Sequence, residues 1–197
     1  TVWEETNVVE LLTEPSDTDD LPRTVGVVVE KGSGERLTIR AKVIVDATGT
    51  STMLARRFGI RETDPALRKA SYFSHFKGGR RDSGKNEGAT LVLSTASNDG
   101  WFWYIPLPDD IVSVGVVGDI DRLVTKNKGK SPQEILDEEL KNCRGLDDRM
   151  TNASQDGPVH VLSAFSYTDT PFACHAVVLV GDASGFLGPV SSCGVVL

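Results

Sequence analysis

The sequence lacks the patterns that mark several common classes of protein. No apolar run approaches the roughly 20 residues that a membrane-spanning helix needs, and no basic segment followed by an apolar one marks a signal peptide at the N-terminus. The three cysteines form no C-x-x-C pair, and the three histidines are scattered without ligand spacing. We therefore expect a cytoplasmic protein with no membrane span, no disulfide framework and no metal site.

Positive charge is also scarce. The chain has 21 lysine and arginine residues against 28 aspartate and glutamate residues, which gives a net charge of −7. Since proteins that bind nucleic acids usually show a basic face, we expect no nucleic-acid partner. Two enzyme motifs are missing as well: the chain has neither a G-x-S-x-G elbow of serine hydrolases nor a G-x-G-x-x-G dinucleotide fingerprint.

Two strand-to-turn segments are the most informative features that the sequence does contain. Val177–Val180 is a continuous apolar run, typical of a parallel strand covered on both faces, and Gly181 and Asp182 follow it. A second apolar run ends in Asp46 and is followed by Gly49. Ligands of parallel sheets bind at the carboxyl ends of strands, so both turns are candidates for a ligand site. The alternative is a pair of ordinary turns with no ligand.

The segment after the second turn has the features of a helix start. Pro189 precedes a run in which Ser192, Cys193 and Gly194 offer a capping side chain and free backbone N–H groups. Such a helix start attracts electron-rich groups. Because Thr1 is not a methionine and residues 194–197 begin a helix that then stops, we expect the chain to be an interior piece of a longer protein.

Other patterns predict the remaining helices and a hairpin. Lys31–Gly34 is a turn between two alternating strands. Thr50 and Ser51 are expected to cap a helix that ends at Gly59. A capping box with proline at the first helical position, Ser131–Glu134, starts a second helix.

Between the two turns the composition changes to short strands and polar loops. Strands are expected at residues 70–76, 89–94, 101–105 and 111–117, with a further one at 159–167. Residues 77–87 are too polar and glycine-rich to pack, so we expect a mobile loop there. The predicted fold class is α/β: an incomplete Rossmann-like domain, residues 1–60 and 173–197, interrupted by an antiparallel sheet domain, residues 61–172.

Trp101 and Trp103 lie two residues apart, so both side chains project from the same side of a strand. Two indoles in that position can form the wall of a pocket. Periodicity alone also fits a pair of aromatic residues in the core.

These motifs together resemble a known family. Gly181-Asp182-Ala183 with the Phe186, Pro189, Ser192 and Gly194 that follow is similar to the second flavin motif of FAD-dependent oxidoreductases, and more narrowly of flavin-dependent halogenases and their reductase and monooxygenase relatives. The D-A-T-G segment 46–49 and the W-x-W-x-I-P string 101–106 resemble the same family.

The resemblance implies a role for each site residue. Asp182, beside Gly181, would hold a ribityl hydroxyl of FAD, and Asp46 and Gly49 would lie close to the cofactor. Pro189 and Ser192 would shape a turn whose amides, at Cys193 and Gly194, face the flavin and bind halide. Trp101 and Trp103 would form part of the substrate pocket. Residues 1–60 and 173–197 would be two parts of an FAD-binding domain, and residues 61–172 a substrate domain.

The implied activity uses reduced FAD, oxygen and halide to halogenate an aromatic or pyrrole-type substrate, free or bound to a carrier. A separate flavin reductase is the expected supplier of reduced FAD. The family's catalytic lysine precedes the matched segment, so this chain alone is expected to be inactive. Ser191 and Gly188 depart from the family pattern. They leave open a double-bond reductase or a monooxygenase that needs no halide, and the missing lysine leaves open a non-catalytic fragment.

Overall fold

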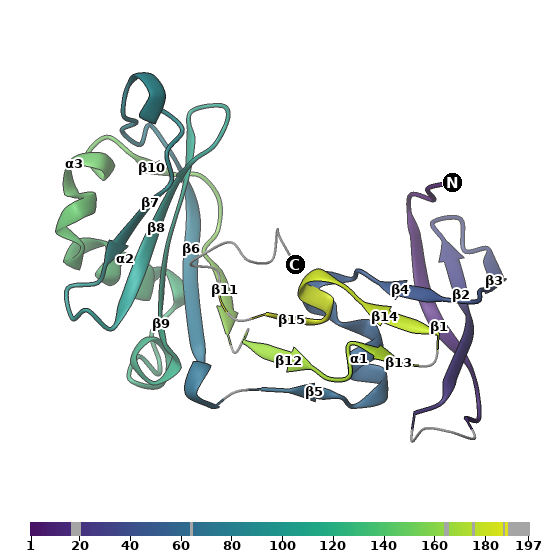
Figure 1. The fold of residues 1–197 in the computed structure, drawn as a ribbon. Coiled ribbons are helices and arrows are strands. Elements are labelled where there is room, and N and C mark those ends of the chain that lie inside the picture. Colours follow the sequence, from purple (N-terminus) through teal and green to yellow (C-terminus); the bar gives the residue numbers. More distant parts are fainter. Residues whose placement is uncertain (17–20, 64, 164–165, 175, 187, 189–197) are drawn as a thin grey trace. The chain divides into compact units, whose positions relative to one another are not determined.

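The computed structural model describes residues 1–16, 21–63, 65–163, 166–174, 176–186 and 188 (Figure 1). The chain divides into two compact units, one formed by Thr1–Asp64 with Ser166–Leu197 and the other by Pro65–Phe165. The mixture of helices, a parallel strand pair and antiparallel sheets confirms the predicted α/β fold class. Of the helices within the described ranges, none is both long and apolar enough to cross a membrane.

The described strands of the first unit form three small sheets. The first is an antiparallel meander of β1 (Thr6–Glu14), β2 (Arg23–Lys31) and β3 (Arg36–Arg40). In the second, β4 (Ile44–Asp46) runs parallel to β14 (Val177–Leu179), and β13 (Ala173–Cys174) pairs with the other edge of β14. In the third, β12 (Tyr167–Asp169) lies between β5 (Arg61–Glu62) and β15 (Gly185–Phe186).

The predicted hairpin around Lys31–Gly34 is confirmed. The Gly34 N–H donates to the Lys31 carbonyl at 2.8 Å, and Gly34 has a φ of 82°, in the left-handed region that glycine adopts without strain. The turn therefore joins β2 to β3 in register, with Glu30 opposite Arg36.

The short helix α1 (Met53–Phe58) packs on the parallel strands. Leu54 and Ala55 are fully buried and form a core cluster with Val177 and Leu179 of β14. The helix ends at Gly59 as predicted, because Gly59 adopts a φ of 68° and its N–H bonds to the last turn.

The predicted start of this helix is wrong. Gly49–Ser51 form a separate 3₁₀ turn, η1, and the N-cap of α1 is Thr52, whose side chain makes no capping hydrogen bond. The carboxylate of Asp46 accepts the Leu54 N–H instead. Short polar residues beside a glycine fit either a cap or a turn, and here they form the turn.

The second unit is built on a six-stranded antiparallel sheet. Its strand order is β10-β6-β9-β8-β7, and β11 also pairs with β6. The strands are β6 (Lys69–Lys77), β7 (Leu91–Ser94), β8 (Gly100–Pro106), β9 (Ile111–Asp119), β10 (Ser154–Gln155) and β11 (His160–Ser163). The four strands predicted between residues 70 and 117 are confirmed. The strand predicted at 159–167 ends earlier, since β11 stops at Ser163 and Tyr167 begins β12 of the first unit.

Helical segments cover one face of this sheet (Figure 1). They are η4 (Asp121–Thr125), α2 (Pro132–Asn142), η5 (Arg144–Leu146) and α3 (Asp147–Met150). The unit also contains the 3₁₀ turns η2 (Pro65–Leu67) and η3 (Gly84–Asn86). Leu123 of η4, Leu136 of α2 and Leu146 of η5 are almost fully buried with the side chains of the sheet. The predicted capping box is confirmed: the Ser131 hydroxyl accepts the Glu134 N–H, and the Glu134 carboxylate accepts the Ser131 N–H.

Residues 80–82 of the loop after β6 pack, contrary to the prediction of a mobile loop, whereas residues 83–88 are exposed. Arg149 Nη2 lies 3.0 Å from both oxygens of Asp82, and the Tyr104 hydroxyl donates to the Arg80 carbonyl at 3.0 Å. Burial raises the pKa of the Tyr104 hydroxyl above its ordinary value. The Asp82 carboxylate, one of the charges that argued against packing, is thus one of the groups that anchor the loop.

Candidate functional site

The structure brings the two predicted glycine turns together. β4 and β14 are parallel with Leu179 opposite Asp46, so their carboxyl ends lie side by side, and the turns η1 and η6 (Gly181–Ala183) follow in contact with each other. Gly49 and Gly181 adopt φ values of 61° and 55°, which favour glycine. Asp46, Gly49, Gly181 and Asp182 thus occupy the same end of a parallel strand pair, where ligands of such sheets bind.

Asp46 is buried at the end of β4, with 2% of its surface exposed. Its Oδ1 accepts the Thr48 N–H at 2.9 Å and the Thr48 hydroxyl at 2.6 Å, and its Oδ2 accepts the Leu54 N–H at 2.9 Å. The carboxylate therefore ties the strand, the turn and the start of α1 together. That direct contact between Asp46 and a cofactor also occurs stays a prediction.

Asp182 has the opposite environment. Its Oδ1 is buried but accepts no hydrogen bond, although its backbone carbonyl accepts the Tyr167 hydroxyl at 2.6 Å. A buried polar atom without a partner costs about 1–3 kcal/mol. A ligand hydroxyl donating to Oδ1 would remove that cost, so the side chain fits the ribityl group of FAD that the sequence motif implies.

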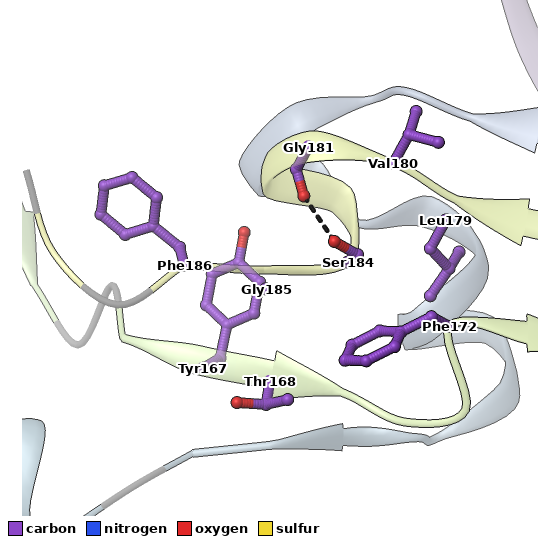
Figure 2. A pocket seen from close by; sticks show the side chains of 9 residues that line it. All are labelled: Tyr167, Thr168, Phe172, Leu179, Val180, Gly181, Ser184, Gly185 and Phe186. Atoms are coloured by element: carbon purple, nitrogen blue, oxygen red, sulfur yellow. Dashed lines mark hydrogen bonds between the residues drawn. The ribbon is translucent and has the colours of Figure 1, made fainter. Parts of the chain in front are cut away.

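An apolar pocket of about 460 Å³ lies beside η6 (Figure 2). Phe172 and Leu179 face into it, and Gly181 and Ser184 of the turn form part of its wall. The Ser184 hydroxyl donates to the Gly181 carbonyl at 2.8 Å, which closes the turn on itself. Asp182 Oδ1 accepts none of the hydrogen bonds of this turn.

A group of buried polar residues that the sequence reasoning missed lies next to the turns. The Arg61 guanidinium lies 3.6 Å from the ring centre of Tyr167, and its Nε lies 3.4 Å from Asp169 Oδ1. Asp169 is fully buried, which raises the pKa of its carboxyl; Asp46 raises it further, whereas Arg61 and Arg56 lower it.

The sequence held one signal for this group. Tyr167 and Asp169 are two residues apart in a strand, so their side chains share a face, as those of Trp101 and Trp103 do. An ionisable residue is almost never fully buried unless it is paired, but burial is not visible in the sequence. Their strand was also expected to belong to the inserted sheet.

Trp101 and Trp103 lie on β8 of the second unit, with ring centres 6.0 Å apart. Both are half-buried and lie outside the buried core cluster of that unit. The Trp103 Nε1–H donates to the Ser113 hydroxyl at 3.1 Å, which fixes the direction of the indole. The pair is thus not part of the packed core, which was the alternative to a pocket wall.

These tryptophans continue an aromatic row across the sheet. His160, Phe73, Gly115 and Trp103 are successive partners on β11, β6, β9 and β8. Ring centres are 5.2 Å apart for Phe73 and His160 and 5.5 Å apart for Phe73 and Trp103. A Cβ at Gly115 would lie 2.6 Å from Trp103 Cη2, so only glycine leaves room for the indole. The row could contact a planar substrate.

The last part of the predicted site lies outside the described residues. It comprises the turn and helix start at Pro189, Ser192, Cys193 and Gly194. Their expected roles toward flavin and halide stay predictions.

Comparison with known proteins identifies the family. Residues 23–197 match the family model described as tryptophan halogenase. The chain is 30% identical over 174 residues to the 1H-pyrrole-2-carbonyl-[peptidyl-carrier protein] chlorinase of Pseudomonas fluorescens, covering 86% of the chain and 38% of that protein. It is 31% identical over 176 residues to the corresponding brominase of Pseudoalteromonas luteoviolacea, covering 88% of the chain and 42% of that protein.

Solved structures agree with these matches. The myxobacterial chondrochloren halogenase CndH superposes with a TM-score of 0.83 at 29% identity, covering 96% of this chain and 42% of that one. The flavin-dependent brominase Bmp2 superposes with a TM-score of 0.81 at 29% identity, covering 97% of this chain and 46% of that one. The chain therefore spans roughly two fifths of the length of the curated relatives it matches.

Proposed function

The chain belongs to the tryptophan halogenase family, and from this premise we propose that the full-length protein containing it is an FAD-dependent halogenase of aromatic or pyrrole-type substrates. The observation that carries the proposal is the buried, unpartnered Oδ1 of Asp182 beside two glycine turns at the ends of parallel strands. That oxygen offers an acceptor to a ligand hydroxyl where a dinucleotide would lie.

Each residue of the turns has a distinct task in this proposal. Asp182 accepts a ribityl hydroxyl, and Gly49 and Gly181 let the backbone approach the cofactor. Asp46 holds the first turn in place through its three hydrogen bonds. Reduced FAD, when bound, supplies the electrons with which oxygen is activated to oxidise halide. The backbone amides of Cys193 and Gly194 are the proposed halide site.

We assign the two units of the chain to different tasks. The division into Thr1–Asp64 with Ser166–Leu197 and Pro65–Phe165 supports an FAD-binding part and a substrate part, with bounds close to the predicted 1–60 with 173–197 and 61–172. In the substrate part, Trp101 and Trp103 present aromatic surface that suits a planar ring. The names of the two pyrrole halogenases specify a pyrrole held on a peptidyl carrier protein. We extend that substrate class to this protein, with a separate flavin reductase supplying reduced FAD.

Titration with FAD tests the cofactor site. The full-length protein is titrated with FAD, and the dissociation constant is measured by equilibrium dialysis. Asp182→Ala should weaken binding at least tenfold, because it removes a hydrogen bond to a charged acceptor worth about 1.5–3 kcal/mol. Asp82→Ala is the matched control, since Asp82 is a half-buried, hydrogen-bonded aspartate of the other unit. Equal affinities for the two variants would contradict the assignment of Asp182.

A halide-dependence assay tests the reaction. The full-length protein is supplied with reduced FAD, oxygen and a carrier-bound pyrrole, with and without chloride or bromide, and the products are analysed by mass spectrometry. We expect a halogenated product only when halide is present. A reduced or hydroxylated product that forms equally well without halide would replace halogenation with a reductase or monooxygenase activity.

A further inference from the structure

We propose that Arg61, Tyr167 and Asp169 form a brace that fixes the position of the Gly181 turn (η6) against the Gly49 turn (η1), and that FAD affinity depends on this brace. The inference rests on the proposed function, since it concerns residues that position the proposed flavin site. The polar groups of all three bond to the turns or to one another. They are therefore positioning residues, which act through the turns.

One end of the brace holds η6. The Tyr167 hydroxyl donates to the Asp182 carbonyl at 2.6 Å, and the Asp169 N–H donates to the Ser184 carbonyl at 3.0 Å. Burial raises the pKa of the Tyr167 hydroxyl above its ordinary value. Two carbonyls of a four-residue segment are thus bonded to β12, and the backbone of Asp182 is held by a side chain.

The other end of the brace reaches η1. Arg61 Nη2 donates to the hydroxyl of Thr52, the fully buried residue that links η1 to α1. Thr52 in turn donates its N–H to the Gly49 carbonyl at 3.0 Å. Thr52 has a φ of 41°, a conformation that costs energy in a β-branched residue and needs support from its surroundings. The guanidinium supplies part of that support.

Arg61 joins the two ends. Its guanidinium stacks on the Tyr167 ring and pairs with Asp169, whose Oδ2 is buried and accepts no hydrogen bond. An ion pair buried with an unsatisfied oxygen is poor evidence for stabilisation, because desolvation offsets the attraction. The planar, directional contacts of the Arg61 guanidinium are better suited to fixing geometry. The brace thus fixes how η1 and η6 face each other, with Asp182 Oδ1 unpartnered.

The brace predicts how Tyr167→Phe changes FAD binding. The variant keeps the ring under Arg61 and removes only the hydroxyl that holds the Asp182 carbonyl. We expect the dissociation constant for FAD to rise about fivefold to tenfold, in line with the loss of one buried hydrogen bond. The absorption band of bound flavin should also change shape, because the turn no longer holds the cofactor in one position.

Tyr104→Phe is a closely matched control. Tyr104 is also buried, its hydroxyl also donates to a backbone carbonyl, that of Arg80, and Arg149 lies 5.6 Å from its ring centre. Both variants should lose similar thermal stability without FAD. Only Tyr167→Phe should lose affinity and alter the flavin spectrum. Arg61→Lys, which keeps the charge but not the planar group, should weaken FAD binding as well.

The outcomes separate this inference from the proposed function. If the unmodified full-length protein binds no FAD, or Asp182→Ala binds it unchanged, the proposed flavin site fails. If Asp182→Ala weakens binding but Tyr167→Phe and Arg61→Lys bind FAD as tightly as Tyr104→Phe does, the flavin site stands and the brace is refuted. A weaker affinity of both brace variants with an altered flavin spectrum supports the brace.

Discussion

Replacing Asp46 with alanine should destabilise the protein through the start of α1. The Leu54 N–H is fully buried and would lose its acceptor, which costs about 1–3 kcal/mol. This bond is also the one that caps the first turn of α1, so the loss is counted once. Thr48 is exposed, so its two donors regain hydrogen bonds with water and add little. We therefore expect Asp46→Ala to lower the free energy of unfolding by about 1–3 kcal/mol.

Urea unfolding without FAD, followed by circular dichroism, measures this loss. Asp46→Asn retains one acceptor oxygen and should cost less than Asp46→Ala. Asp119→Ala is the control, because Asp119 is half exposed and its pair with Lys69 is a surface ion pair worth about 0–1 kcal/mol. If Asp46→Ala were no more destabilising than Asp119→Ala, the conclusion that Asp46 holds the turn and the helix together would be wrong.

Three further substitutions test other parts of the structure. Gly115→Ala should displace the Trp103 indole, shift tryptophan emission to longer wavelength and cost about 1–3 kcal/mol in urea unfolding; unchanged emission would contradict the tight fit. Ser131→Ala should cost about 1 kcal/mol in the same assay, and no loss would rule out a stabilising capping box. The pKa of Asp169 is raised by burial, so its contribution to stability is full below the unfolded pKa and is lost as pH rises through the folded pKa. The stability of the protein relative to Asp169→Asn should therefore fall as pH rises through this range, and a difference independent of pH would refute the shift.

Local patterns predicted the fold where local chemistry decides it. The capping box at Ser131, the left-handed glycine at Gly59 and the glycine turn at Lys31–Gly34 each form as their residues require. Prediction failed where partners distant in sequence decide the outcome. The loop after β6 packs because Arg149 lies beside Asp82, 67 positions away. No window of the sequence shows that pairing.

The candidate site likewise combines features that local patterns predict with features that depend on partners distant in sequence. Alternation placed Trp101 and Trp103 on one side of a strand, but the space for the indole comes from Gly115 on the neighbouring strand. Likewise Arg61 pairs with Asp169, 108 positions away, so the brace could not be predicted from either segment. The residues proposed to contact FAD thus belong to local motifs, whereas the residues proposed to position them come together only when the chain folds back.

Two aspartates near the ends of neighbouring parallel strands thus have different roles. The residues after Asp46 supply three donors, from Thr48 and from the start of α1, and its carboxylate is satisfied within the protein. The residues after Asp182 close on themselves through Ser184, and its Oδ1 is left without a donor. Asp46 is therefore a structural residue of this turn, whereas Asp182 has an oxygen free to accept the hydroxyl of the proposed ligand. If Asp182 binds FAD as proposed, FAD should stabilise Asp182→Ala less than the unmodified protein.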